Sequence, residues 1–316
     1  MPSNKPQLRV VSRSSRLGSR AASSQPPTVS PQWLLRALGF SAIAALFCAW
    51  GTLCLLFWQG SWQLLYHPAA AVTRTPASAG LAYEPVGFAA TETGQLRMLG
   101  WWIPAAANAP FARFTVLYLH GATGNLGNTV EALARLHAAG VNVFAFDYRS
   151  YGLSRFLHPS EASWRQDAAW ALNYLSGTRH IDPHAIVLDG DGLGANLALE
   201  VAAAHPELAG VVIESPIENA VSAIFDDARA HLVPAHLLVH DRYDMDAAAA
   251  ALQVPSLWVL PAGAGAARNP PAAFGKDAAP KQLVYLPAGA GAGPSATDAG
   301  AVFADALTHW LASLSK

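Results

Sequence analysis

The sequence predicts an α/β domain with an eight-stranded, mainly parallel sheet covered by helices on both faces, preceded by one transmembrane helix. Apolar, β-rich runs alternate with helical stretches over most of the chain, and a long uncharged apolar run precedes them. Strands that are apolar throughout are typical of parallel sheets covered on both sides. One of these strands also passes through a glycine turn directly into an alanine-rich helix.

The amino-acid composition excludes some classes of function. The chain has 316 residues, 52% hydrophobic content and a formal net charge of −1, enough for one sizeable core. Because there is no basic excess, we expect no nucleic-acid partner. No motif calls for a cofactor. Both cysteines, Cys48 and Cys54, fall inside the apolar run, so we interpret them as packing residues and not as a disulfide.

The N-terminal region predicts a tail and a membrane span. Residues 1–32 are rich in Ser, Pro, Gln and Arg, which predicts a disordered basic cytoplasmic tail. No Asp, Glu, Lys or Arg occurs between residues 37 and 73. The run Ala37 to Trp58 is long enough to cross a hydrocarbon layer of about 30 Å as a helix. We therefore expect a transmembrane signal-anchor helix over residues 33–60.

The residues that flank this run predict its orientation. Aromatic side chains of the interfacial type bracket it: Trp33, Trp58, Trp62 and Tyr66. The arginines lie on its N-terminal side, so we expect a single-pass protein of the inner (cytoplasmic) membrane, with its N-terminus inside and its C-terminal domain periplasmic or otherwise extracytoplasmic. A cleavable signal peptide is the competing interpretation, but the leader and the apolar run are both too long for one. A buried core helix of this length would be unusual.

The remaining chain divides into a juxtamembrane linker, residues 61–76, and a domain, residues 77–316. A leading antiparallel hairpin is predicted over Ala82–Thr91 and Arg97–Pro104. Six further strands are predicted at Phe114–Leu119, Val141–Phe146, Ile186–Leu188, Val211–Ile213, Leu257–Leu260 and Leu283–Leu286. Helices are predicted at Asn128–Ala139, Glu161–Leu175, Ala195–Ala204 and Gly300–Ser313, with a further helical region between Ile217 and Leu252.

The strand-turn-helix segment from Ala185 to Asn196 has the pattern of a nucleophile elbow with one essential difference. In the G-x-S-x-G pattern the central residue has a strained, positive φ, and its side-chain oxygen projects clear of the sheet. The central residue is Gly192 in this chain. Glycine adopts positive φ without steric cost but supplies no oxygen.

Several motifs, taken in their order along the chain, resemble those of the α/β-hydrolase superfamily, in particular of membrane-anchored bacterial serine hydrolases and esterases. The motifs are Gly100-Trp101-Trp102-Ile103-Pro104, the run from Tyr118 to Asn125, the run from Asp147 to Ser154, Pro159-Ser160-Glu161 with Asp167, the elbow, and Glu214-Ser215-Pro216. The resemblance implies the α/β-hydrolase fold. It also implies an oxyanion hole formed by the backbone N–H groups of Ala122, which follows His120-Gly121, and of Leu193.

The same resemblance implies that the catalytic triad is replaced. The acid position after the strand at Leu257–Leu260 is occupied by Ala266, and the histidine position after the last strand by Ala292. With Gly192 at the nucleophile, the three vestigial positions carry no reactive group. The only histidine after His240 is His309, inside the predicted C-terminal helix, where it cannot serve as the base.

Other polar residues near the predicted site have less specific interpretations. Asp191 could be a carboxylate nucleophile, but we interpret it as a solvated turn residue. Ser150 and Ser154 are alternative nucleophiles, although turn serines commonly bond their own backbone. His120 is interpreted as a structural loop histidine. Asp147 and Arg149 are expected to form an ion pair that orders the loop.

The sequence argues against two further classes of site, a metal site and a dinucleotide-binding site. Asp241, Asp244 and Asp246 lack the spacing of a calcium loop, and no Cys/His set indicates zinc, so no metal site is expected. The glycine runs Gly121–Gly127 and Gly190–Ala195 imitate dinucleotide fingerprints. Their position late in the strand order argues against this, because such a fingerprint normally follows the first strand of its domain.

The sequence thus predicts a membrane-anchored hydrolase-like protein that has lost hydrolytic activity and has a binding or scaffold role. A small acyl or anionic ligand between the N–H groups of Ala122 and Leu193, and a protein partner of unknown identity, are expected. The alternative is an active esterase-like or lipase-like serine hydrolase with a non-standard nucleophile, and a minor alternative is a dinucleotide-binding protein.

Overall fold

The computed structural model of the chain describes residues 30–89, 94–95, 98–154, 157–262, 269–287 and 294–315. The chain forms two compact units, residues 1–50 and 51–316. Helix α1 (Pro31–Gly60) runs through the division between them. The most apolar window of α1 has a mean hydropathy of 2.1 and is only 6% buried, so it differs from the core helix of a soluble protein. It is long and apolar enough to cross a membrane.

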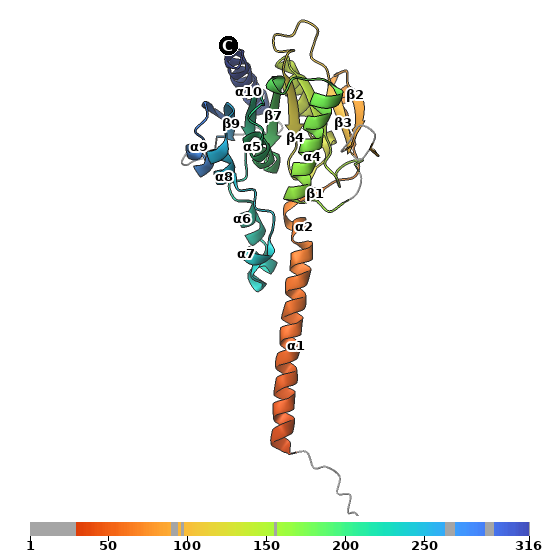
Figure 1. The fold of residues 1–316 in the computed structure, drawn as a ribbon, viewed down its shortest axis with the longest axis vertical. Helices are drawn as coiled ribbons and strands as arrows, with labels where there is room; N and C mark the ends of the chain where they lie inside the picture. The colour runs from red at the N-terminus through yellow and green to blue at the C-terminus, as the bar shows by residue number, and fades with distance from the viewer. Residues whose placement is uncertain are drawn as a thin grey trace, which may run out of the picture. The chain divides into compact units, whose positions relative to one another are not determined.

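The second unit contains the predicted sheet (Figure 1). Within the described residues, eight strands pair in the order β10-β9-β8-β7-β4-β6-β3-β2. Their bounds are β2 (Glu84–Phe88), β3 (Met98–Ile103), β4 (Thr115–Leu119), β6 (Asn142–Phe146), β7 (Ile186–Asp191), β8 (Gly210–Glu214), β9 (Ser256–Pro261) and β10 (Lys281–Leu286). All neighbours are parallel except that β3 is antiparallel to both β2 and β6. The predicted α/β architecture with a leading hairpin is confirmed.

Helices pack on both faces of this sheet. The bounds of the α-helices are α2 (Trp62–Leu65), α3 (Val130–Ala138), α4 (Glu161–Asn173), α5 (Leu193–Ala204), α6 (Ala220–Phe225), α7 (Ala235–Leu238), α8 (Met245–Ala251), α9 (Ala272–Lys276) and α10 (Pro294–Ser313). The shorter turns are 3₁₀ segments at Pro76–Ala79, Leu126–Asn128, Pro183–Ala185 and Ala228–Leu232, and a π-helical turn at Tyr174–Thr178.

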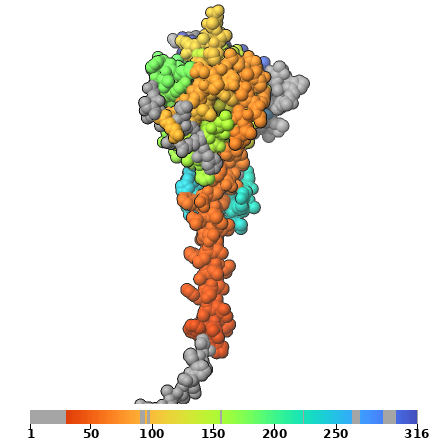
Figure 2. Space-filling view, turned by 90° about the vertical axis from the view of Figure 1, so that its right-hand side faces the viewer, coloured from red at the N-terminus to blue at the C-terminus, as the bar shows by residue number. Residues whose placement is uncertain are grey.

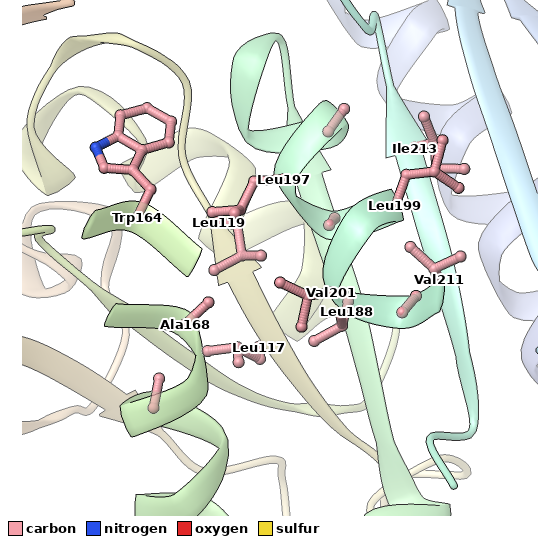
Figure 3. Close-up of a cluster of buried hydrophobic side chains, with 14 of the residues drawn as sticks. Leu117, Leu119, Trp164, Ala168, Leu188, Leu197, Leu199, Val201, Val211 and Ile213 are labelled. Carbon is pink, nitrogen blue, oxygen red and sulfur yellow. The ribbon is translucent and has the colours of Figure 1, made fainter. Parts of the chain in front are cut away.

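The core lies between the central strands and these helices. Figure 3 shows Leu117 and Leu119 of β4 and Leu188 of β7 facing Trp164 of α4 and Val201 of α5. Helices α3 and α10 cover the opposite face, where a second apolar cluster lies. Because the central strands are buried on both faces, they are apolar at nearly every position, which is why the sequence identified them.

The helical region predicted between Ile217 and Leu252 consists of the short helices α6, α7 and α8 with intervening turns (Figure 1). One part of the fold differs from the sequence-based expectation. The segment 61–76, expected as a linker, contains α2 and strand β1 (His67–Pro68), which pairs in parallel with β5 (Thr123–Gly124). A two-residue strand leaves no periodicity in a sequence, so this pairing could not be predicted.

Candidate functional site

The elbow has the backbone that the sequence predicts. Strand β7 ends at Asp191, α5 begins at Leu193, and Gly192 between them has φ 57° and ψ −122°. Its N–H donates a hydrogen bond to the carbonyl of Glu214 at 3.0 Å, which fixes the turn to the neighbouring strand. An ideal Cβ on Gly192 would meet no atom within 4 Å. A side chain at this position would therefore enter open space, but on a backbone that favours glycine.

Two glycines, Gly194 of the elbow and Gly121 of the loop after β4, let these two backbone segments touch. A Cβ on Gly194 would collide with the carbonyl of Leu119 and lie 2.6 Å from the carbonyl oxygen of His120. A Cβ on Gly121 would lie 3.2 Å from the carbonyl oxygen of Asp191. The loop after β4 is thus packed directly on the elbow, which brings together the segments that contain Ala122 and Leu193.

The loop after β4 is held from both sides. The carbonyl of Ala122 accepts hydrogen bonds from the N–H of His67 at 2.8 Å and from the hydroxyl of Tyr151 at 2.7 Å. Neither the N–H of Ala122 nor that of Leu193 has an acceptor among the described residues. The N–H of Leu193 is one of the free donors at the start of a helix, a position that favours negative charge.

His120 is buried in an aromatic cluster. It is 1% exposed, its ring centroid lies 4.5 Å from that of Tyr148, and Tyr151 and Trp164 also contact it. Its Nδ1 lies 2.8 Å from the carbonyl oxygen of Gly121, and Nε2 lies 3.6 Å from Asp147 Oδ1. Burial lowers the pKa of His120 to about 4, so the ring is neutral at pH 7.

The expected ion pair between Asp147 and Arg149 is not formed. Arg149 Nε lies 2.5 Å from Asp167 Oδ1, and the backbone N–H of Arg149 donates to Asp167 Oδ2 at 2.9 Å. Asp147 instead accepts a hydrogen bond from the backbone N–H of Leu126 at 2.9 Å. The error arose because neighbours in sequence were assumed to pair, whereas each of the two side chains has a partner from a distant segment, Leu126 for Asp147 and Asp167 for Arg149.

The two alternative nucleophiles have hydrogen bonds to the backbone. Ser150 Oγ accepts from the N–H of Leu157 at 3.1 Å, and Ser154 Oγ donates to the carbonyl of Asp147 at 2.7 Å. These are turn-type contacts, as the sequence analysis anticipated. Ser150 also has a φ of 89°, an uncommon conformation for a residue other than glycine.

A buried carboxylate cluster lies on the α3 side of the sheet and was missed by sequence reasoning. Arg135 of α3 donates to both carboxylate oxygens of Glu214, at 2.8 and 2.7 Å. Asp189 of β7 is fully buried nearby, and burial raises its pKa well above the ordinary range, with the charge of Glu214 raising it further. An aspartate inside an otherwise apolar strand was the available signal, since such a residue is rarely buried without a partner.

Those of the remaining predicted site residues that the structure describes are not assembled into a reactive centre. Ala266 and Ala292 lie outside the described residues. His309 is exposed on α10, and Asp191 is exposed at the end of β7. Asp241 accepts hydrogen bonds from the Tyr66 hydroxyl and the N–H of Glu161, both at 3.0 Å. Over the part of the chain that the structure describes, no three His, Cys, Asp or Glu residues form a candidate metal site.

The dinucleotide interpretation of the run Gly121–Gly127 meets a structural difficulty. This run passes through β5 and a 3₁₀ turn, and α3 begins only at Val130. The glycine turn therefore does not open directly into a helix, which is the arrangement that would aim N–H groups at a pyrophosphate.

Comparison with known proteins identifies the family. A family model described as "Serine aminopeptidase, S33" matches residues 111–250. The uncharacterized protein Rv2307c of Mycobacterium tuberculosis is 30% identical over 283 residues, covering 87% of this chain and 95% of that protein. The α/β hydrolase domain-containing protein WAV2 of Arabidopsis thaliana is 29% identical, over 49% of this chain and 48% of its own length.

Comparison with solved structures agrees with the sequence comparison. The structure of the Pyrococcus furiosus esterase Pf2001 aligns with a TM-score of 0.59 at 17% sequence identity, covering 78% of this chain and 98% of the esterase. The chain belongs to the α/β-hydrolase superfamily.

Proposed function

We propose that this α/β-hydrolase superfamily member is a membrane-anchored binding or scaffold protein that has lost hydrolytic turnover. One observation carries the proposal: the residue at the apex of the elbow is Gly192, with φ 57° and ψ −122°. The position has the backbone of a nucleophile but no side-chain oxygen to attack an acyl carbon. The alanines at 266 and 292, which occupy the acid and base positions implied by the family resemblance, are consistent with this loss.

The surrounding side chains support the loss of turnover. His120 is buried among aromatic rings, and its Nδ1 contacts the carbonyl oxygen of Gly121 in its own loop. The hydroxyls of Ser150 and Ser154 are occupied by backbone hydrogen bonds. A serine without an adjacent base stays protonated and is a poor nucleophile at neutral pH.

The binding role rests on the two N–H groups of Ala122 and Leu193. They belong to segments held in contact by Gly121 and Gly194, and they need no particular side chain. We propose that they hold a carboxylate or an acyl carbonyl oxygen of a small ligand. The protein partner of such a scaffold is left open.

We further propose that α1 anchors the protein in the cytoplasmic membrane, with the N-terminus inside and the hydrolase-like domain outside. The apolar, largely exposed α1 and the arginines before it support this orientation. Protease protection in spheroplasts tests it: the domain should be cleaved from outside, and cleavage only after lysis would contradict the orientation.

Activity-based labelling tests the loss of turnover. The full-length protein in detergent micelles should neither react with a fluorophosphonate probe nor hydrolyse short-chain p-nitrophenyl esters. Covalent labelling of the protein at a stoichiometry near one would overturn the proposal.

Restoration variants sharpen this test. Gly192→Ser alone should remain inactive, because alanine occupies the base position implied by the family resemblance, whereas combining it with Ala266→Asp and Ala292→His should produce measurable esterase activity. Appreciable turnover from the single change would reveal a base that the proposal denies. Circular dichroism of each variant controls for folding.

A second candidate function is an acyl hydrolase that uses Ser150. The positive φ of Ser150 favours it, since strained residues cluster at functional sites. If the wild-type protein is labelled, mass spectrometry of the modified peptide decides between Ser150 and any other residue. Loss of labelling in Ser150→Ala, with labelling retained in Ser154→Ala, would establish this candidate in place of the first.

A further inference from the structure

The end of α1 packs against a separate part of the second unit. We call residues 220–239, which contain α6 and α7, the cap segment. Phe57 is 8% exposed and lies in an apolar cluster with Ile224, Val233 and Val239 of the cap segment, against which Cys54 also packs. In Figure 2 the teal and cyan atoms of this region border the orange atoms near the end of α1. The cap segment therefore contacts the same turns of α1 that complete its apolar run.

The position of these turns in a bilayer follows from the length of the helix. At 1.5 Å per residue, the run from Ala37 to Trp58 is about 33 Å long, close to the hydrocarbon thickness of about 30 Å. Cys54 and Phe57 then lie inside the edge of the hydrocarbon layer, and Trp58 and Gln59 at its boundary with the headgroups. Because Ile224, Val233 and Val239 of the cap segment pack in one cluster with Phe57, these side chains must lie at the same depth.

The exposed side chains of the cap segment fit this depth. Leu237 is 79% exposed and Leu232 is 61% exposed, and the histidines that precede them, His236 and His231, are exposed as well. Exposed leucines beside exposed polar side chains are typical of a surface that lies at a membrane interface, where acyl chains accommodate the apolar groups.

A cavity opens between α1, α2 and the cap segment. Its volume is about 410 Å³, within the size range of small-molecule sites. Trp58, Trp62, Ile224 and Val239 form its apolar wall, whereas Gln59 and His240 stand among its polar lining groups. The rings of Trp58 and His240 lie 6.1 Å apart across it. The cavity thus has an apolar interior and polar groups at the depth of the membrane boundary.

We propose that this cavity holds one acyl chain of a phospholipid drawn from the membrane leaflet that contains the end of α1. The proposal rests on the proposed membrane anchorage. The chain lies against the indoles and Val239, and the ester-linked glycerol lies near Gln59 and His240. The described residues that line the cavity include no lysine or arginine, so they offer no fixed positive charge to a fatty-acid carboxylate, and Asp241 is already bonded to Tyr66 and Glu161. This favours an esterified chain over a free fatty acid.

Photo-crosslinking in vesicles tests the proposal. The full-length protein is reconstituted into phosphatidylethanolamine–phosphatidylglycerol vesicles containing either a phosphatidylethanolamine with a diazirine in one acyl chain or a free diazirine fatty acid. After irradiation, peptides are mapped by mass spectrometry. We expect crosslinks from the phospholipid probe to peptides containing Trp62 and Val239, in addition to those along α1.

Two matched variants distinguish crosslinking inside the cavity from crosslinking to the surrounding lipid. Ser61→Phe places a ring at the cavity lining and should reduce phospholipid crosslinking to the Val239 peptide at least fivefold, with crosslinking along α1 unchanged. Gln63→Phe adds the same bulk to an exposed position of α2 that does not line the cavity and should have no such effect. Circular dichroism spectra and thermal midpoints confirm that both variants fold.

The outcomes distinguish a failure of the phospholipid site from a failure of the membrane anchorage on which it rests. If the protein fails to float with vesicles, the anchorage and the lipid site are both overturned. If it floats but the cavity peptides are not labelled, are labelled equally in Ser61→Phe, or are labelled only by the free fatty acid, the phospholipid site is overturned and the anchorage stands.

Discussion

The elbow around Gly192 and the loop after β6 lie near each other in the domain but are built in different ways. The elbow is defined by its backbone: glycines at 190, 192 and 194 allow close contacts and a positive φ. The loop after β6 is defined by side chains, namely the buried pair of Arg149 and Asp167 and the stacked rings of Tyr148 and Trp164, whose centroids lie 4.0 Å apart.

This difference explains how reactive side chains can be lost while the fold remains. A Cβ at position 192 would meet no atom of the described residues within 4 Å, so a side chain there adds no close packing at its Cβ. The side chains after β6 are bonded and buried, so removing any of them leaves a cavity or an unpaired charge. The stability of the fold therefore depends on the side chains of the loop after β6 and on the close-packed glycines of the elbow. It does not depend on a side chain at position 192.

The largest effect is expected at the buried ion pair. Asp167→Ala leaves the Arg149 guanidinium without its carboxylate in a site where Asp167 is fully buried, and should lower the free energy of unfolding by about 3–5 kcal/mol. Urea unfolding of the full-length protein in detergent, monitored by tryptophan fluorescence, measures the change.

The matched control for this prediction is Glu131→Ala, which removes one partner of the exposed pair with Arg74. It should change stability little, because water and salt screen that pair. Equal effects of the two substitutions would show that the loop after β6 does not depend on its ion pair.

A smaller effect is expected where the elbow meets the loop after β4. Gly194→Ala places a methyl group against the carbonyls of Leu119 and His120, which are both backbone atoms and cannot rotate away. We expect a loss of about 1–3 kcal/mol, the usual cost of overpacking. The measurement is again the urea midpoint.

Gly177→Ala serves as the control for the elbow, because a Cβ on Gly177 meets no atom within 4 Å and φ is not positive. It should be neutral or slightly stabilising. A Gly194→Ala protein as stable as wild type would contradict the tight packing of the two segments.

The last prediction concerns the pH dependence of stability at Asp147. Burial raises the pKa of Asp147 from 3.8 to about 7, so between these values the folded state holds a proton that the unfolded chain releases. Stability from this group therefore falls as pH rises from about 4 to about 7. Asp147→Asn does not titrate, so the variant should lack this fall, a difference of at most roughly 1.4 kcal/mol per pH unit.

Unfolding of both proteins between pH 5 and 8 provides the comparison. The lowered pKa of His120 has the opposite effect in both: its stability contribution rises with pH from about 4 to 6.5. The difference between the two curves thus reports on Asp147. A stability difference that does not change with pH would show that folding does not raise the pKa of Asp147.

Much of the fold could be predicted from local patterns. The strands β4, β7 and β8 were predicted because they are apolar at nearly every position, and the conformation of Gly192 because a strand and a helix meet at it. The partner of Arg149 could not be predicted, since Asp167 lies on a separate helix and only packing brings the two together. The same holds for Asp189 beside Glu214 and for His67 against Ala122.

The sequence alone determined the apolar helix, the alternating order of strands and helices, and the absence of a nucleophile at position 192, because each depends on residue type and local spacing. Tertiary structure alone decided which charges pair, how the loop after β4 is held against the elbow, and where a cavity opens beside the end of α1. These features depend on contacts between residues far apart in the chain, and such contacts leave no periodicity in a sequence.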